Sequence, residues 1–213
     1  MTYPGLMLAA LLLTAAPAWA ARMTASVVDT GGVPLEDAVV TLTPSDGGAV
    51  QLRSGQGTVD QLNLEFVPYV TVITAGSMVT FPNSDNVRHH VYSFSAAKSF
   101  ELPLYAGAAA PSVRFDKPGV VPLGCNIHDW MIGYVYVAAT PYAARTGRDG
   151  KVALDVPAGS YVARVWHPSQ VGAEATTQRS VKVDETGQAL SWSLELKPSF
   201  RIPRRSGGKG FGY

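Results

Sequence analysis

The chain has 213 residues, of which 46% are hydrophobic and 15% are charged, and its formal net charge is +1. This length suffices for one large hydrophobic core or two small ones. The nearly neutral charge argues against a nucleic-acid-binding protein and gives no preference for an acidic partner. Glycine and proline are frequent, with 21 and 15 residues, and the apolar runs are short. That composition, with its short apolar runs, favours a turn-rich all-β protein over a helical bundle.

Residues 1–20 have the pattern of a secretory signal peptide. Residues 6–16 are apolar, and Ala-Trp-Ala at 18–20 is a small-x-small cleavage site. The start lacks the usual Lys or Arg, so an N-terminal membrane anchor is the alternative. The apolar stretch is short for a span, which needs about 20 residues, and it contains Pro17. We therefore predict export to the periplasm without stable membrane insertion.

After this signal, the chain is predicted to alternate short strands with turns. A polar, Gly-rich loop is expected at 45–57. No ten-residue window has a convincing helical period, and only 84–88 and 106–110 are candidates for a short helix. In chain order the predicted strands are 24–29, 38–43, 65–73, 78–82, 89–94, 99–102, 112–115, 120–123, 132–137, 151–156, 161–166, 180–183 and 190–196.

The segments near the two ends of the chain have similar sequence patterns. VVDTGGVPLEDAVVTLTP near the N-terminus and TGRDGKVALDVPAGSYVARVWHP near the C-terminus resemble the β-sandwich of carboxypeptidase-regulatory-like and transthyretin-like domains. In that pattern the second phrase follows the first closely, whereas here about a hundred residues intervene. We therefore predict that a domain of residues 59–140 is inserted in, or fused to, a small β-sandwich formed by 21–58 and 141–198. The basic tail 199–213 is predicted to be disordered.

The inner segment carries a set of metal-ligating side chains. Cys125 is the only cysteine, and His128 and Met131 follow it at C-x2-H-x2-M spacing. A second imidazole is available from the pair His89-His90. Two histidines, a cysteine thiolate and a weak axial methionine are the ligands of a blue-copper site. A lone cysteine in an exported protein has no partner for an internal disulfide, which is consistent with a metal-bound thiolate.

The sequence around these side chains resembles the cupredoxins. The stretches are TAGSMVTFPNSDNVRHHVYSF and VPLGCNIHDWMIGYVYV. The C-x2-H-x2-M loop is similar to the short form in amicyanin, and V-x-F-x-N…H-x-V is similar to plastocyanin and amicyanin. The resemblance covers roughly residues 60–140. It implies a Greek-key cupredoxin β-sandwich with one type I copper site, and a departure is His90, where cupredoxins usually have Asn or Ser.

Only one histidine of the pair is expected to bind the metal, because adjacent side chains on a strand point to opposite faces. The H-x-V pattern of the resemblance assigns the ligand to His89. The apolar Tyr92 shares the other face with His90, so His90 stays the alternative ligand. With His89 as ligand, the residues expected beside the metal ligands are His90, Asn83 and Asn126, and the backbone N–H of His90 is expected to reach the Cys125 sulfur.

We therefore predict a periplasmic one-electron carrier with His89, Cys125, His128 and Met131 as copper ligands. Its partners would be redox proteins, a cytochrome c or a periplasmic dehydrogenase, in transient complexes. An enzyme is disfavoured, because the four histidines include no H-x-H pair for a catalytic copper and one cysteine is too few for a two-copper entry site. Zinc, or a buried cysteine without metal, is the alternative for the site. A copper chaperone or resistance protein, and a structural β module with incidental metal, are the alternatives for the function.

Overall fold

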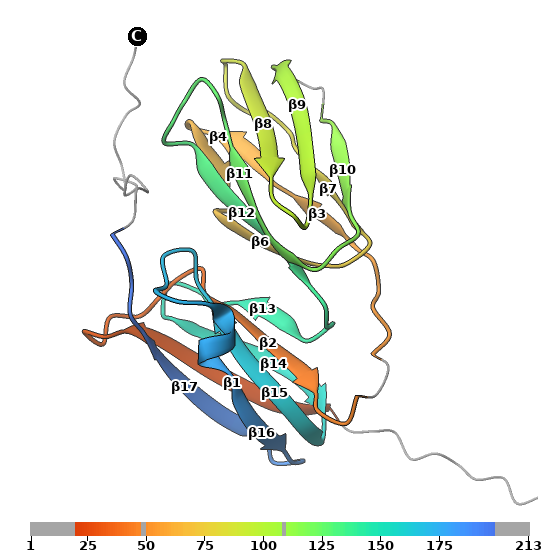
Figure 1. Ribbon diagram of the computed structural model, residues 1–213, viewed down its shortest axis with the longest axis vertical. Helices are drawn as coiled ribbons and strands as arrows, with labels where there is room; N and C mark the ends of the chain where they lie inside the picture. The colour runs from red at the N-terminus through yellow and green to blue at the C-terminus, as the bar shows by residue number, and fades with distance from the viewer. Residues whose placement is uncertain (1–19, 48–49, 108–109, 199–213) are drawn as a thin grey trace, which may run out of the picture.

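The computed structural model describes residues 20–47, 50–107 and 110–198, which form two β-sandwiches (Figure 1). The predicted all-β fold class is confirmed, and the described residues contain one short helix, the 3-10 turn η1 (Glu174–Thr177). The predicted signal peptide, apart from its last residue, and the predicted disordered tail lie outside the described residues. No helix in the described part is long and apolar enough to cross a membrane.

The first sandwich combines strands from both ends of the chain. Along β1, Ala21, Met23, Ala25 and Val27 are buried while the residues between them are more exposed, the period of two that a half-buried strand requires. These side chains pack with Trp192 and others in one core between two sheets. In spatial order the sheets are β14 (Lys151–Pro157), β1 (Ala20–Asp29) and β17 (Gln188–Leu194), facing β13 (Ala143–Arg145), β2 (Val39–Pro44), β15 (Gly159–Trp166) and β16 (Arg179–Val183).

The second sandwich is formed by the chain between β2 and β13. Its core includes Phe66, Phe81, Phe115 and Val135, together with Cys125. In spatial order its sheets are β10 (Ser112–Phe115), β7 (Ser77–Thr80) and β3 (Gln56–Thr58), facing β6 (Val70–Thr74), β12 (Ile132–Ala138), β11 (Gly119–Gly124), β8 (His89–Phe94) and β9 (Ser99–Tyr105). The hairpin β4 (Asp60–Leu62) and β5 (Glu65–Val67) adds a small two-stranded sheet.

An aromatic cluster joins the two sandwiches. Trp166 of β15 contacts Tyr134 and Tyr136 of β12, with ring centroids 5.5 Å apart in both pairs. The Tyr136 hydroxyl donates a 2.7 Å hydrogen bond to Glu174 Oε1 of η1. Val39 of β2 is buried in the same cluster. The chain therefore leaves the first sandwich after β2 and returns at β13, with a packed apolar contact between the two bodies.

Several local expectations differ from the structure. The predicted strand 65–73 is two strands, because Pro68 between β5 and β6 has no N–H to donate to a ladder. The predicted loop 45–57 ends inside β3, which lies in the segment 21–58 but pairs with β7 of the second sandwich. Residues 84–88 form no helix, and candidate 106–110 includes positions outside the described residues. The short strands β4 and β13 and the 3-10 turn η1 were not predicted. Independent folding of residues 59–140, and the kinship of the first sandwich with regulatory-like domains, stay predictions.

Candidate metal centre

Two segments meet at one end of the second sandwich. His89 begins β8, and Cys125 directly follows β11 at the start of the loop 125–131 that leads to β12. Gly124 pairs with Tyr92, which holds the end of β11 beside β8. In Figure 1 the β11–β12 loop lies at the end of this sandwich that points away from the first one. Strand pairing thus brings a histidine and a cysteine together that are 36 positions apart in the sequence.

Three of the four predicted ligands form a compact group. One potential ligand atom from each of His89, Cys125 and His128 lies within 4.8 Å of the other two. Cys125 Sγ is 3.8 Å from His128 Nδ1, and the rings of the two histidines are 5.0 Å apart between centroids, inclined by 60°. His89 is fully buried, Cys125 is buried and His128 is half-buried. One thiolate and two imidazoles are therefore poised around one point.

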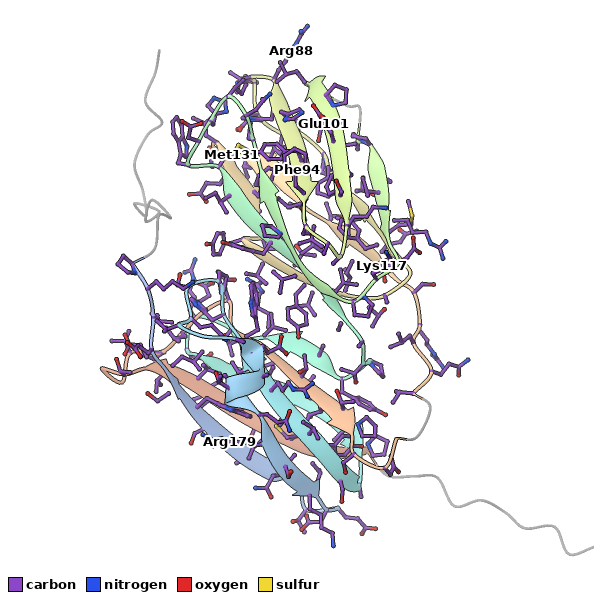
Figure 2. The ribbon with its side chains drawn as sticks, in the orientation of Figure 1. Arg88, Phe94, Glu101, Lys117, Met131 and Arg179 are labelled. Atoms are coloured by element: carbon purple, nitrogen blue, oxygen red, sulfur yellow. The ribbon has the colours of Figure 1, made fainter. Side chains whose placement is uncertain are left out.

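Met131, the fourth predicted ligand, is buried at the end of the same loop, directly before β12. It packs in the core cluster that contains Cys125, and its backbone N–H donates a 2.9 Å hydrogen bond to the His128 carbonyl. Figure 2 shows Met131 near this end of the second sandwich. Met131 and Cys125 also line one open groove of about 770 Å³. The loop thus carries Cys125, His128 and Met131 as a single hydrogen-bonded turn.

The first histidine has one ring nitrogen bound and one free. His89 Nε2 is 2.8 Å from Asp85 Oδ2. The buried Nδ1 of His89 has no hydrogen-bond partner of acceptable geometry. Burial, the largest influence, lowers the pKa of His89, but the neighbouring Cys125 and Asp85 side chains raise it, and the net direction is upward. A buried nitrogen without a hydrogen-bond partner, beside a thiol, fits the ligand atom of a metal site.

The cysteine is held in a form suited to metal binding. Burial, the largest single influence, raises the pKa of the Cys125 thiol, yet His89, the backbone N–H groups of His90 and Ile127, and His128 together lower the pKa to about 6. Because the thiolate is the metal ligand, this surrounding favours the reactive form near neutral pH.

The residues predicted to lie beside the ligands occupy three different places. The His90 side chain contacts Glu101 through Nε2 at 2.8 Å and stacks near Tyr92, while its backbone N–H reaches the Cys125 sulfur. Asn83 is buried and donates to the carbonyls of Val87 and Tyr105, both at 2.9 Å. Asn83 therefore anchors the loop before β8.

Asn126 is exposed on the ligand loop and lines the groove beside Cys125. Two apolar side chains are exposed around His128, beside the exposed polar Asn126 and Asp129 of the same loop. Trp130 lies 5.4 Å from the His128 ring between centroids and is 45% exposed, and Ile127 is 48% exposed. The half-buried imidazole therefore reaches the surface beside these two apolar side chains.

Asp85 was not among the residues predicted from the sequence. The signal was available, because metal-ligating histidines usually donate their second ring N–H to a carboxylate or carbonyl. An acidic residue four positions before the first histidine of HH was therefore a candidate for that partner.

A scan of protein-family models and a search of curated proteins each found no match. Part of the chain is similar to a number of solved structures, including the three that follow. A copper-containing nitrite reductase from Thermus scotoductus is 27% identical over 45% of this chain and 25% of its own, with a TM-score of 0.38. A purple cupredoxin from Nitrosopumilus maritimus is 25% identical over 40% of this chain and 100% of its own, with a TM-score of 0.35.

A reduced amicyanin variant is 22% identical over 46% of this chain and 98% of its own, with a TM-score of 0.37. The chain thus spans only a quarter of the nitrite reductase, and each of the three matches covers less than half of this chain. The case for a metal therefore rests on the side chains described above.

Proposed function

We propose that the protein binds one copper ion as a type I site and serves as a one-electron carrier in the periplasm. His89, Cys125 and His128 would hold the ion, with Met131 as a weak axial ligand. The observation that carries the proposal is the buried group of one thiol and two imidazoles, with ligand atoms within 4.8 Å of one another and His89 Nδ1 unpartnered. Bound copper would supply a one-electron couple between Cu(I) and Cu(II).

The donor set favours copper over zinc. Structural zinc sites complete a tetrahedron with four Cys or His ligands, and catalytic ones add water to three protein ligands. In the described part of the chain, no further His, Cys, Asp or Glu joins the group of His89, Cys125 and His128. The remaining candidate is the Met131 thioether, a soft donor that suits copper and is the long axial ligand of blue-copper centres.

The surroundings favour electron transfer over catalysis. The ligands are buried or half-buried, whereas a substrate needs an open coordination position. The apolar rim of Ile127 and Trp130 lies beside the half-buried His128 and suits a brief contact with another redox protein. A cytochrome c or a periplasmic dehydrogenase would be such a partner, and the periplasmic location rests on the sequence pattern of residues 1–20.

The test is the visible absorption of the mature protein, residues 21–213, loaded with Cu(II) and then reduced. An intense thiolate-to-copper band that bleaches on reduction supports the site, and Cys125→Ser should abolish it while keeping the fold. A folded but colourless wild-type protein would refute the proposal. Fast electron exchange with copper retained against a Cu(I) chelator supports a carrier of electrons, whereas rapid loss of copper to the chelator would favour the copper-chaperone alternative.

A further inference from the structure

The Asp85 carboxylate receives three polar contacts that no sequence pattern assigned. Its Oδ1 accepts the backbone N–H of Asn63 at 2.6 Å, and its Oδ2 accepts the N–H of Leu64 at 2.9 Å. The same Oδ2 lies 2.8 Å from His89 Nε2. The side chain is 12% exposed. A nearly buried carboxylate therefore sits between the β4–β5 turn and the first candidate ligand.

The turn that binds Asp85 has an unusual backbone. Asn63 and Leu64 have φ values of 56° and 59°, a left-handed conformation that few non-glycine residues adopt. Their two successive N–H groups both point to the one carboxylate. A strained turn of this kind persists only where its surroundings hold it. The carboxylate therefore has a fixed position before any contact with His89 is considered.

The loop that carries Asp85 is fixed from the opposite side as well. The Asp85 backbone N–H donates to Asn83 Oδ1 at 3.1 Å, and the Asn83 amide binds the carbonyls of Val87 and Tyr105. The oxygen that faces His89 therefore has little freedom to move. A fixed acceptor at Nε2 selects the neutral tautomer with its proton on Nε2, which leaves the Nδ1 lone pair free.

We propose that Asp85 is a positioning residue for the metal centre, which holds the His89 ring and tautomer so that Nδ1 faces Cys125 and His128. As far as the metal is concerned, this inference rests on the proposed function. A carboxylate that accepts the ring N–H also increases the basicity of the imidazole. Asp85 therefore stabilises Cu(II) at His89 more than Cu(I), and it lowers the reduction potential.

The competing interpretation is that Asp85 only ties the turn at residues 63–64. Asp85→Asn separates the two roles, with Asp60→Asn as the matched control. Asp60 bonds Ser84 in the same loop, through Oδ1 to the backbone N–H and Oδ2 to the hydroxyl, but no contact joins it to His89 among the described residues. Both variants remove one carboxylate charge and disturb the same loop.

We expect Asp85→Asn to weaken Cu(II) binding by about 10- to 100-fold, the usual effect of losing a partner of a metal-bound histidine. Each tenfold loss for Cu(II) over Cu(I) raises the potential by about 59 mV. Asp60→Asn should leave the potential within a small fraction of that shift. Voltammetry and competition with a Cu(II) chelator measure both quantities, and equal potentials for Asp85→Asn and Asp60→Asn would overturn the proposal.

A second measurement needs neither a metal nor a variant. Long-range proton–nitrogen NMR correlations of the metal-free wild-type protein at alkaline pH report which ring nitrogen of His89 carries the proton. Protonated Nε2 is expected, and a proton on Nδ1 would overturn the proposal. The two failures stay distinct, because a colourless copper-loaded protein would refute the proposed function, while the tautomer still decides the role of Asp85.

Discussion

Gly133→Ala tests whether the second sandwich, which carries the ligand loop, depends on the tight packing of β12 against Phe66 of β5. A Cβ at Gly133 would lie 2.7 Å from the Cβ of Phe66 and 3.3 Å from two of its ring carbons. Phe66 is 1% exposed in the core, and an atom so near the backbone cannot move aside without the strand β5. Such overpacking costs about 1–3 kcal/mol. The lower chain entropy of Ala in the unfolded state returns about 0.4–1 kcal/mol.

The net loss expected for Gly133→Ala is therefore about 1–2 kcal/mol in the free energy of unfolding of the second sandwich. With a urea slope of about 1–3 kcal/mol per M, the unfolding midpoint should fall by roughly 0.3–2 M. Cys125 is the single thiol and is 3% exposed, so pulsed thiol labelling in urea reports the opening of this sandwich and not of the other.

Gly55→Ala is the matched control. A Cβ there would meet only the Ser77 hydroxyl oxygen, at 3.9 Å, an ordinary contact. Gly55→Ala should therefore be neutral or slightly stabilising. If Gly133→Ala labels at the same urea concentration as wild type, or if both variants shift alike, the packing argument for β12 is wrong.

Three further predictions follow from single contacts. His89→Ala should abolish the copper band while His90→Ala keeps it, and the reverse result would make His90 the ligand. Titration of the metal-free protein, followed by absorbance at 240 nm, should show the Cys125 thiolate forming near pH 6 and not near pH 9, with Cys125→Ser as the baseline. Because the pKa of Cys125 is lowered in the folded state, this group should stabilise the fold increasingly as the pH rises from about 6 toward 9. Tyr136→Phe should weaken the contact between the sandwiches by about 1–2 kcal/mol through loss of the bond to Glu174, measured by urea unfolding, and an unchanged midpoint would show that this bond contributes nothing.

The strands could be predicted where side-chain alternation is strong. In β8, Val91 and Ser93 are buried whereas Tyr92 and Phe94 are more exposed, as the pattern predicts. The histidine pair departs from this alternation, because His89 and His90 are both buried and the pairing with β9 is irregular between His89 and Val91. The short strands β3, β4 and β13 were not predictable, because three residues carry no period. Their pairing is decided by neighbours distant in the sequence, which no local pattern contains.

The candidate site was likewise only partly predictable from the sequence. Cys125 and His128 are three residues apart, so one loop brings them together and their spacing alone suggested it. Asp85 is held in place by the turn at Asn63 and Leu64, more than twenty residues earlier, and only the folded hairpin shows that contact. Sequence patterns therefore found the atoms that would touch a metal but not the residue that orients one of them.

The arrangement of the two sandwiches also bears on how a carrier would meet its partners. The first sandwich covers β6 and β12 through the cluster around Trp166, and that surface is closed to other proteins. The ligand loop lies at the opposite end, where Trp130 and Ile127 stay exposed around His128. The first sandwich therefore leaves the proposed electron-transfer surface free, and any partner that it recruits would be held beside this rim and not over it. An added domain placed in this way can raise the local concentration of a redox partner without blocking the exposed imidazole edge.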